Sequence, residues 1–172
     1  IPALVKMTEA VHEHGALAGI ELVHGGYSNA NNYSRIPPIA PSVTSVNTYD
    51  PVQARAMDKS DIRELRKWHR QAALRAQQAE FDLIYVYAGH NLTLLMHFLS
   101  RRFNQRTDEY GGSLENRVRL FREVLEDTKD AVGDSCAVAV RFAVDELLGS
   151  KGITSENEGR EVIEMLAELP DL

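Results

Sequence analysis

A tyrosine and a histidine close an apolar run that otherwise reads as a buried strand. The stretch YVYAGHN, residues 85–91, ends in Tyr87, two small residues and His90. Because successive side chains of a strand point to opposite faces, we expect Tyr87 on the same inner face as Tyr85, with His90 on the loop just above it. A phenol beside an imidazole can hold or move a proton of a bound substrate. A lone loop histidine is more often a solvated residue, and only its place after an inward tyrosine favours a site.

Each of the two other predicted strands carries one charged residue opposite its bulky apolar face. These residues are Glu21 and Arg141. Two interpretations are open: an ion pair buried inside a barrel of such strands, or a site that binds a ligand. Burying two charges costs several kcal/mol each unless they are well paired. Ala139 and Ala143 flank the arginine on its face. They favour the ligand site because they leave room for something flat and polar beside the guanidinium.

Metal binding and nucleophilic catalysis are the rival chemistries. His24, His90 and His97 are the candidate metal ligands, with Glu21 as a carboxylate. No H-E-x-x-H spacing places two of them on one helical face, so we expect no metal site. Cys136 is the single cysteine and opens a strand at its amino-terminal, structural end. One cysteine excludes an internal disulfide framework, which fits a reducing, cytoplasmic setting, and no G-x-S-x-G nucleophile motif occurs.

Three successive strand–helix units must position these residues. The expected elements are, in order, a helix over 2–14, a strand over 16–23, a helix over 61–80 capped by Ser60, a strand over 81–87, a helix from Ser113 to about Val132, a strand over 136–144 and a last helix that starts at a Ser155…Glu158 capping box. Long polar excursions over 25–59 and 88–112 follow the first two strands, and loops of this length are usually functional or disordered. Continuous apolar strands joined by crossover helices predict an α/β fold with parallel strands, an arc of a barrel.

The composition bounds the class of protein. The chain has 172 residues, of which 44% are hydrophobic and 26% charged, as expected for one globular domain. A net charge of −6 argues against a nucleic-acid surface. No apolar run approaches the roughly 18 residues that a membrane span needs. The chain starts without methionine inside a helical pattern and stops where a new strand begins, which predicts a piece of a longer protein.

The segment FLSRRFNQRTDEYGGSLENRVRLFREVLEDTKDAVG, residues 98–133, resembles the old yellow enzyme family of flavin oxidoreductases, whose members carry a very similar NQRTDEYGGSLENR run. The stretches IELVHGG (20–26) and VAVRFAVDELLG (138–149) also resemble strands of that family. The resemblance implies an FMN-binding (β/α)8 TIM barrel, of which residues 1–172 are a central fragment with about strands 3 to 5. The remainder of the barrel and any C-terminal domains would lie outside this chain.

The RTDEYGGSLENR motif itself reads as architecture rather than chemistry. Gly111 and Gly112 allow a sharp bend and Ser113 can cap the helix that follows. The residues expected to pin this loop are Arg106, Asp108, Asn116 and Arg117.

The resemblance also implies roles for the polar residues. In that family a glutamine of the third strand and an arginine of the fifth contact the flavin, and these positions fall on Glu21 and Arg141. Glutamate here is similar to the amine-oxidising branch of trimethylamine, dimethylamine and histamine dehydrogenases and of N-methylproline or dimethylglycine demethylases. Enone reductases of the family carry His-x-x-His or His-x-x-Asn and then a tyrosine. Tyr87, His90 and Leu92 stand at those positions, a pattern similar to the Tyr-x-x-His of amine dehydrogenases.

The implied activity is FMN-dependent oxidation of an N-methylated or secondary or tertiary amine, by hydride transfer to flavin N5. Tyr87 and His90 would be catalytic, and Glu21 and Arg141 would bind the cofactor. A 4Fe–4S cluster would belong to the longer protein and not to this chain. The expected partners are a small amine substrate and further copies of the chain in a homo-oligomer, with no nucleic acid and no membrane. Two alternatives stay open: an NAD(P)H-dependent enone reductase of the same fold, and an inactive barrel fragment that self-associates through open strand edges.

Overall fold

Parallel strands joined by helices form the frame that positions the polar residues. The computed structural model describes residues 1–29, 33–45 and 53–169. The helices are α1 (Pro2–His12), α2 (Lys59–Gln78), α3 (Leu94–Leu99), α4 (Leu114–Val132) and α5 (Glu158–Ala167). The strands are β1 (Gly19–Leu22), β2 (Ile39–Ala40), β3 (Thr44–Ser45), β4 (Gln53–Ala56), β5 (Leu83–Ala88) and β6 (Ala137–Phe142). Short 3₁₀ turns lie at Gly26–Ser28, Gly133–Ser135 and Gly149–Lys151.

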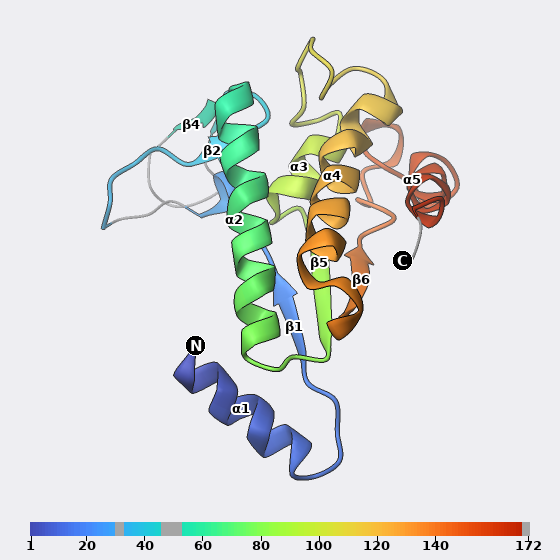
Figure 1. Ribbon diagram of the computed structural model, residues 1–172. Coiled ribbons are helices and arrows are strands. Elements are labelled where there is room, and N and C mark those ends of the chain that lie inside the picture. The colour runs from blue at the N-terminus through green and yellow to red at the C-terminus, as the bar shows by residue number, and fades with distance from the viewer. Residues whose placement is uncertain (30–32, 46–52, 170–172) are drawn as a thin grey trace.

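The main sheet contains β1, β5 and β6, paired in parallel with β5 in the middle. In this register Glu21 lies level with Tyr85, and Arg141 lies level with Tyr87. All three strands run in the same direction, so their carboxyl ends and the loops that follow them meet at one edge of the sheet (Figure 1). The three predicted strands and their parallel pairing are confirmed, with ends that differ by a few residues.

The core lies between this sheet and two long helices. α2 and α4 lie side by side over one face of the sheet (Figure 1). The sheet turns Ile84 and Val86 toward them, and both are fully buried. α2 contributes small residues such as Ala73 and Ala76, which let the helix approach the strands closely. The buried side predicted for α4 is confirmed in full, with Val118, Phe121, Leu125, Thr128 and Val132.

The two polar excursions contain structure that the sequence analysis did not predict. The first holds a small sheet in the order β2-β4-β3, in which β2 is parallel and β3 antiparallel to β4. The second holds α3, whose N-cap Thr93 accepts a hydrogen bond from the backbone N–H of Met96 at 3.3 Å. Every residue of α3 is buried. A helix of six buried residues has no polar face, so its sequence shows no helical periodicity.

The N-terminal cap of α2 is Asp58, and the prediction of Ser60 is wrong. The Asp58 carboxylate accepts from the backbone N–H groups of Ser60 at 2.7 Å and Asp61 at 2.8 Å. The Asp61 carboxylate in turn accepts from the N–H of Asp58 at 2.9 Å. Aspartate caps a helix as well as serine does, and its charge also suits the positive end of the helix dipole. Ser113, by contrast, caps α4 as predicted.

The capping box predicted at Ser155 and Glu158 is also wrong. Asn157 precedes α5 and makes no side-chain cap hydrogen bond. Glu158 turns inward and accepts from Nη2 of the fully buried Arg117 at 2.6 Å, and it also pairs with Arg101. A buried arginine without a carboxylate costs several kcal/mol, which is more than one helix cap contributes. The carboxylate is therefore used for charge compensation.

The loop before α4 is pinned as predicted. The Arg106 guanidinium binds the Asp108 carboxylate through Nε at 2.9 Å and reaches the carbonyl oxygen of Pro41 through Nη1 at 3.0 Å, which ties this loop to the first excursion. Asn116 donates from Nδ2 to the carbonyl oxygen of Gly111 at 3.1 Å. Arg117 also donates to the carbonyl oxygens of Gly112 and Leu99. The motif therefore holds loops in place, and the architectural interpretation is confirmed.

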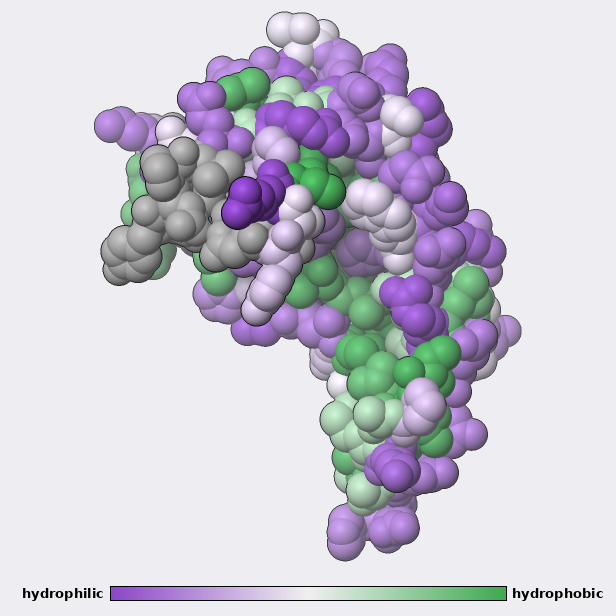
Figure 2. Space-filling model, turned by 90° about the vertical axis from the view of Figure 1, so that its left-hand side faces the viewer, coloured by the Kyte–Doolittle hydropathy of each residue, from purple (hydrophilic) through white to green (hydrophobic). Residues whose placement is uncertain are grey.

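An apolar surface lies at the end of the molecule that carries α1. Figure 2 shows apolar side chains gathered on the lower half of one face. Ile1, Met7 and Leu17 are exposed hydrophobic residues of this end, and Leu17 is 80% exposed. Exposed apolar surface of this kind is typical of an interaction surface. Within the described ranges no helix is long and apolar enough to cross a membrane.

Candidate functional site

Glu21 and Arg141 meet on the face of the sheet that α2 and α4 leave open. Nη1 of Arg141 donates to Oε2 of Glu21 at 2.8 Å. The arginine side chain is 53% exposed and that of Glu21 is 33% exposed, so the ion pair forms without being buried. The hydrogen bond to Glu21 raises the pKa of Arg141 above its usual value. The guanidinium is thus a fixed cation, held in place on one side and accessible on the other.

Tyr87 and His90 form a hydrogen-bonded pair at the end of β5. The Tyr87 hydroxyl contacts Nδ1 of His90, and the two rings lie edge to face with centroids 5.8 Å apart. Tyr87 is 8% exposed whereas His90 is exposed. Burial raises the pKa of the tyrosine phenol, so the hydroxyl keeps its proton at neutral pH and can donate it to Nδ1. A neutral imidazole then carries its own proton on Nε2.

The two predicted pairs are one cluster. The Arg141 guanidinium carbon lies 4.9 Å from the centre of the Tyr87 ring, over its face. Cations are attracted to the negative face of an aromatic ring, so this contact helps to orient both side chains. The cluster therefore runs from Glu21 through Arg141 and Tyr87 to His90, from three different elements. It lies at the carboxyl ends of parallel strands, where α/β proteins place their binding sites.

Gly89 packs against the Tyr87 ring of this site and was not among the residues expected there. A Cβ atom at Gly89 would lie 2.8 Å from Cε2 of the Tyr87 ring and 3.3 Å from its hydroxyl oxygen. The tyrosine folds back over a position that only glycine leaves free. His90 and Asn91 follow with φ angles of 52° and 54°, in the left-handed region that L residues rarely adopt. The signal in the sequence was the glycine directly before the histidine.

The other histidines considered as metal ligands serve different purposes. His24 accepts from the backbone N–H of Gly26 at 3.0 Å and stacks against Trp68. His97 is fully buried in α3 and its Nε2 contacts the carbonyl oxygen of Asn91 at 3.1 Å. Among the residues that the structure describes, no three His, Cys, Asp or Glu side chains converge in a way that could hold a metal ion.

Cys136 is placed for structure rather than for nucleophilic chemistry. The thiol is buried and donates to the carbonyl oxygen of Phe81 at 2.9 Å. Burial raises its pKa, which disfavours the thiolate that a nucleophile needs.

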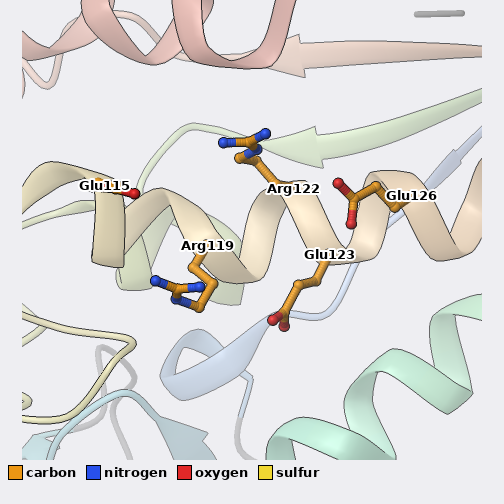
Figure 3. A pocket seen from close by; sticks show the side chains of 5 residues that line it. All are labelled: Glu115, Arg119, Arg122, Glu123 and Glu126. Atoms are coloured by element: carbon orange, nitrogen blue, oxygen red, sulfur yellow. The ribbon is translucent and has the colours of Figure 1, made fainter. Parts of the chain in front are cut away.

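A charged hollow on the outer surface of α4 is a second place to look for a site (Figure 3). Its side chains all come from this one helix: Glu115, Arg119, Arg122, Glu123 and Glu126. Arg119 donates to the carbonyl oxygen of Glu109 at 2.8 Å. Glu123 accepts from the Tyr110 hydroxyl and pairs with Arg66 at 3.2 Å. These contacts hold α2, α4 and the loop before α4 together, so we assign the hollow to the architecture.

Comparison with known proteins shows the family of this chain. The sequence profile described as the NADH:flavin oxidoreductase / NADH oxidase family matches residues 1–171. The chain belongs to this family. Dimethylamine dehydrogenase from Hyphomicrobium sp. (strain x) is 37% identical over 98% of this chain and 24% of its own length.

Two solved structures resemble this flavin oxidoreductase over nearly the whole length of the chain. Histamine dehydrogenase from Rhizobium sp. 4-9 has a TM-score of 0.93 and 52% identity, over 99% of this chain and 25% of that one. The 6-hydroxypseudooxynicotine amine oxidase from Pseudomonas geniculata N1 also has a TM-score of 0.93 and 52% identity, over 98% of this chain and 25% of that one. The chain thus spans about a quarter of the length of these relatives. The predicted fold class, an α/β arc of parallel strands as in the TIM barrels of this family, is confirmed, as is the likeness to its amine-oxidising branch.

Proposed function

We propose that this chain forms the flavin-facing and substrate-facing part of an FMN-dependent oxidoreductase that oxidises a secondary or tertiary amine. The observation that carries the proposal is the exposed Arg141 guanidinium, anchored by Glu21 and lying over Tyr87, with His90 beside it. A fixed cation, a carboxylate and a proton-holding pair then face the same open side of the sheet. The likeness to amine dehydrogenases supports the choice of an amine as substrate.

The donor set fits the pyrimidine edge of a flavin. A fixed cation beside an N1 and C2 carbonyl edge stabilises negative charge that develops there, and Arg141 supplies such a cation. The second oxygen of the Glu21 carboxylate can accept a hydrogen bond from a ring N–H. Gly19, on the same face of β1, leaves room because a Cβ there would meet nothing closer than 3.6 Å. When bound, FMN would supply N5 as the hydride acceptor.

Tyr87 and His90 are proposed to control the proton of the substrate. Only an unprotonated amine has the lone pair that can expel a hydride from the neighbouring carbon, and the product is an iminium ion that water hydrolyses. When the Tyr87 hydroxyl donates to Nδ1 of His90, the neutral imidazole carries its proton on Nε2 and cannot take up a second one there. When the hydroxyl instead accepts a hydrogen bond from Nδ1–H, Nε2 is unprotonated and can accept a proton from the substrate ammonium group. The second arrangement is the one that the proposed proton transfer uses.

The first test uses the pH dependence of amine oxidation in the full-length protein. We expect His90→Gln to shift or abolish the apparent pKa in kcat/KM for an N-methylated amine, because glutamine cannot take up a proton. His14→Gln is the matched control, since His14 is exposed just after α1 and lies on none of the strands that carry the cluster. An apparent pKa identical in wild type and His90→Gln would refute the role of the pair.

The second test concerns cofactor binding. Arg141→Met removes the cation and keeps the length of the side chain, so we expect the purified full-length protein to lose most of its flavin absorbance. Arg141→Lys keeps the charge without the planar fork and should retain part of it. Arg160→Met, which removes an exposed arginine of α5, is the control. Full flavin content in Arg141→Met would contradict the proposed contact.

Enone reduction is the alternative reaction on the same fold. Leu92 stands where enone reductases of the family carry a tyrosine, and its side chain cannot donate a proton. Amine oxidation therefore has the better-matched residues. Assaying cyclohexenone beside N-methylated amines separates the two, since an enone reductase would turn over cyclohexenone with NAD(P)H and leave the amines unchanged.

The association state and the further cofactor are also proposals. The exposed apolar residues Ile1, Met7 and Leu17 support association with further copies, in a homo-oligomer or, for the isolated chain, in an inactive self-associated form. Size-exclusion chromatography of the isolated chain with a flavin absorbance trace tests the second form, for which a colourless oligomer is expected. A 4Fe–4S cluster would need cysteines from outside residues 1–172, because this sequence has one.

A further inference from the structure

The loop that carries His90 has a conformation that must be held in place. His90 and Asn91 both have positive φ, at 52° and 54°. For an L residue the left-handed conformation costs roughly 1–2 kcal/mol, and two in succession add up. Asparagine tolerates it better than most residues, and histidine is also found there more than average. Such a turn persists only where neighbouring groups fix it.

His97 provides one of the contacts that fix this turn. Its Nε2 lies 3.1 Å from the carbonyl oxygen of Asn91, the second of the two left-handed residues. The turn also has a hydrogen bond from the N–H of Leu92 to the carbonyl oxygen of Gly89 at 3.2 Å. The N–H of Gly89 donates to Oγ1 of Thr93, also at 3.2 Å. Of these three contacts, only the one from His97 comes from the body of a helix.

The surroundings of His97 determine which nitrogen carries its proton. A carbonyl oxygen can only accept, so Nε2 is the donor and a neutral ring leaves Nδ1 bare. Nδ1 is buried and has no hydrogen-bond partner within the described residues. A Cβ at Gly26 would lie 2.7 Å from it, so that glycine makes the space for the ring. Protonation of Nδ1 would therefore place a charge against apolar surroundings.

The aromatic neighbours keep this ring neutral and immobile. The rings of Tyr27 and Phe103 have centroids 4.3 Å and 5.2 Å from that of His97. The titratable groups near it are Tyr27 and His24. Burial lowers the pKa of His97 to about 4; the hydrogen bond to the Asn91 carbonyl oxygen opposes this shift, and His24 adds a smaller lowering contribution. At neutral pH the ring is a fixed Nε2–H donor with one tautomer.

We propose that His97 is a positioning residue, whose Nε2–H holds the carbonyl oxygen of Asn91 and thereby sets the place of His90 against Tyr87. The role in amine oxidation rests on the function proposed above for His90. His97 is fully buried and lies outside the cluster that is proposed to face the substrate and the cofactor. Its contribution is the geometry of the loop, and a misplacement of about 1 Å in an active-site group can lower a rate by about 10²-fold.

The test compares His97→Leu with His97→Gln in the full-length flavin-loaded protein. Leucine fills much of the space and cannot donate, whereas glutamine can place an amide N–H near the position of Nε2. We expect His97→Leu to lower kcat for an N-methylated amine by up to about 10²-fold and to shift the apparent pKa assigned through His90→Gln. We expect His97→Gln to restore most of both. Equal losses in the two variants would overturn the proposal.

His69 offers a matched control. It is another buried histidine whose Nδ1 has no partner among the described residues, and burial also lowers its pKa to about 4. It lies on α2, whereas His97 contacts the carbonyl oxygen of Asn91 in the loop of His90. His69→Leu should lower stability as His97→Leu does and leave the pH profile of amine oxidation unchanged. If His69→Leu and His97→Leu shift the pH profile equally, general destabilisation explains the effect, and the proposal is overturned.

A crystal structure of the full-length His97→Leu protein separates this inference from the proposed function. We expect the Asn91 carbonyl group to turn and the Tyr87–His90 hydrogen bond to be lost. An unchanged loop over 89–93 would overturn the positioning role, whatever the activity. A displaced loop together with an unchanged pH profile would uphold the positioning role and refute the function proposed for His90. If His97→Leu fails to accumulate, His97→Met, whose flexible side chain fills irregular space, replaces it in every measurement.

Discussion

The site residues differ in how firmly the chain itself holds them. Glu21 and Arg141 form an ion pair that is open to solvent, and exposed pairs contribute only about 0.2–1 kcal/mol to stability. Tyr87 and its glycine neighbour are buried. The ion pair is therefore better explained by what Arg141 can bind than by stabilisation of the fold, whereas the tyrosine end of the cluster depends on tight packing.

Gly89→Ala should disturb the cluster through packing alone. The added methyl group would lie 2.8 Å from Cε2 of the Tyr87 ring, which forces the ring to move. Overpacking of this kind costs typically about 1–3 kcal/mol, so we expect a loss of that size in the free energy of unfolding, measured by urea denaturation. Gly19→Ala is the control, because its methyl group would find nothing closer than 3.6 Å. Equal losses in the two variants would mean that the clash at Tyr87 is not the cause.

At the scale of elements, a buried ion pair joins the beginnings of α4 and α5. Arg117 is fully buried and its Nη2 lies 2.6 Å from Oε1 of Glu158. The same guanidinium binds the carbonyl oxygen of Gly112 in the loop before α4. One side chain thus fixes two helices and a loop. Breaking such a pair costs far more than the pair contributes, because the remaining charge stays buried.

Glu158→Gln should therefore be strongly destabilising although it changes one atom. The variant leaves the Arg117 charge without a compensating carboxylate, and we expect a loss of about 3 kcal/mol or more in the free energy of unfolding. Glu164→Gln on the same helix is the control. Its partner Arg160 is exposed, and such an i,i+4 pair is worth about 0.3–0.5 kcal/mol. A small loss for Glu158→Gln, measured by urea denaturation, would contradict the view that Glu158 compensates a buried charge.

The N-terminal cap of α2 can be tested by comparing Asp58, the cap in the structure, with Ser60, the cap predicted from the sequence. Asp58→Ala removes the acceptor for the N–H groups of Ser60 and Asp61, and we expect the melting temperature to fall in line with a loss of about 1 kcal/mol. Ser60→Ala, inside the first turn, should have a much smaller effect. The reverse order, measured by circular dichroism, would favour the cap predicted from the sequence.

At the scale of the whole molecule, two buried histidines make stability depend on pH. Burial lowers the pKa of both His69 and His97 from 6.5 to about 4. The unfolded chain takes up a proton at each position below about pH 6.5, whereas the folded chain does so only below about pH 4. The stability that each neutral ring contributes is therefore complete above pH 6.5 and is lost as the pH falls toward 4.

We expect the free energy of unfolding to fall by about 2 kcal/mol per histidine between pH 7 and pH 5. His69→Leu and His97→Leu should each flatten this dependence, as measured by urea denaturation at the two pH values. Leu99→Ala, a buried change without a titratable group, should lower stability by the same amount at both. If the free energy of unfolding still depends on pH in the double variant His69→Leu, His97→Leu, other titratable groups cause that dependence.

The fold could be predicted largely from local patterns. Each strand has its bulky residues on one face, and strand parity alone places Glu21, Tyr87 and Arg141 on the opposite face. Ser113 and the buried side of α4 follow from a capping residue and a helical period. α3 could not be found in this way, because all its residues are buried and its sequence carries no polar face.

The candidate site could be predicted only in part. Its four polar residues were recognisable by type and strand position, and their flavin and substrate roles stay predictions that the proposed variants test. Gly89 and His97 were missed as parts of the site. The glycine matters only because Tyr87 folds back over it, and the histidine only because α3 returns to the loop of His90.

The sequence by itself determined which residues share a face and which strands run parallel, because alternation and helical period are properties of neighbouring residues. Only the tertiary structure decided that Glu158 serves Arg117, 41 residues away, instead of capping its own helix. It also decided that Arg141 reaches Glu21 across 120 residues of chain. Contacts of this kind depend on how the strand–helix units pack against one another. Glu158 could cap its own helix or pair with Arg117, and it pairs with Arg117 because that arginine would otherwise be a buried charge without a partner.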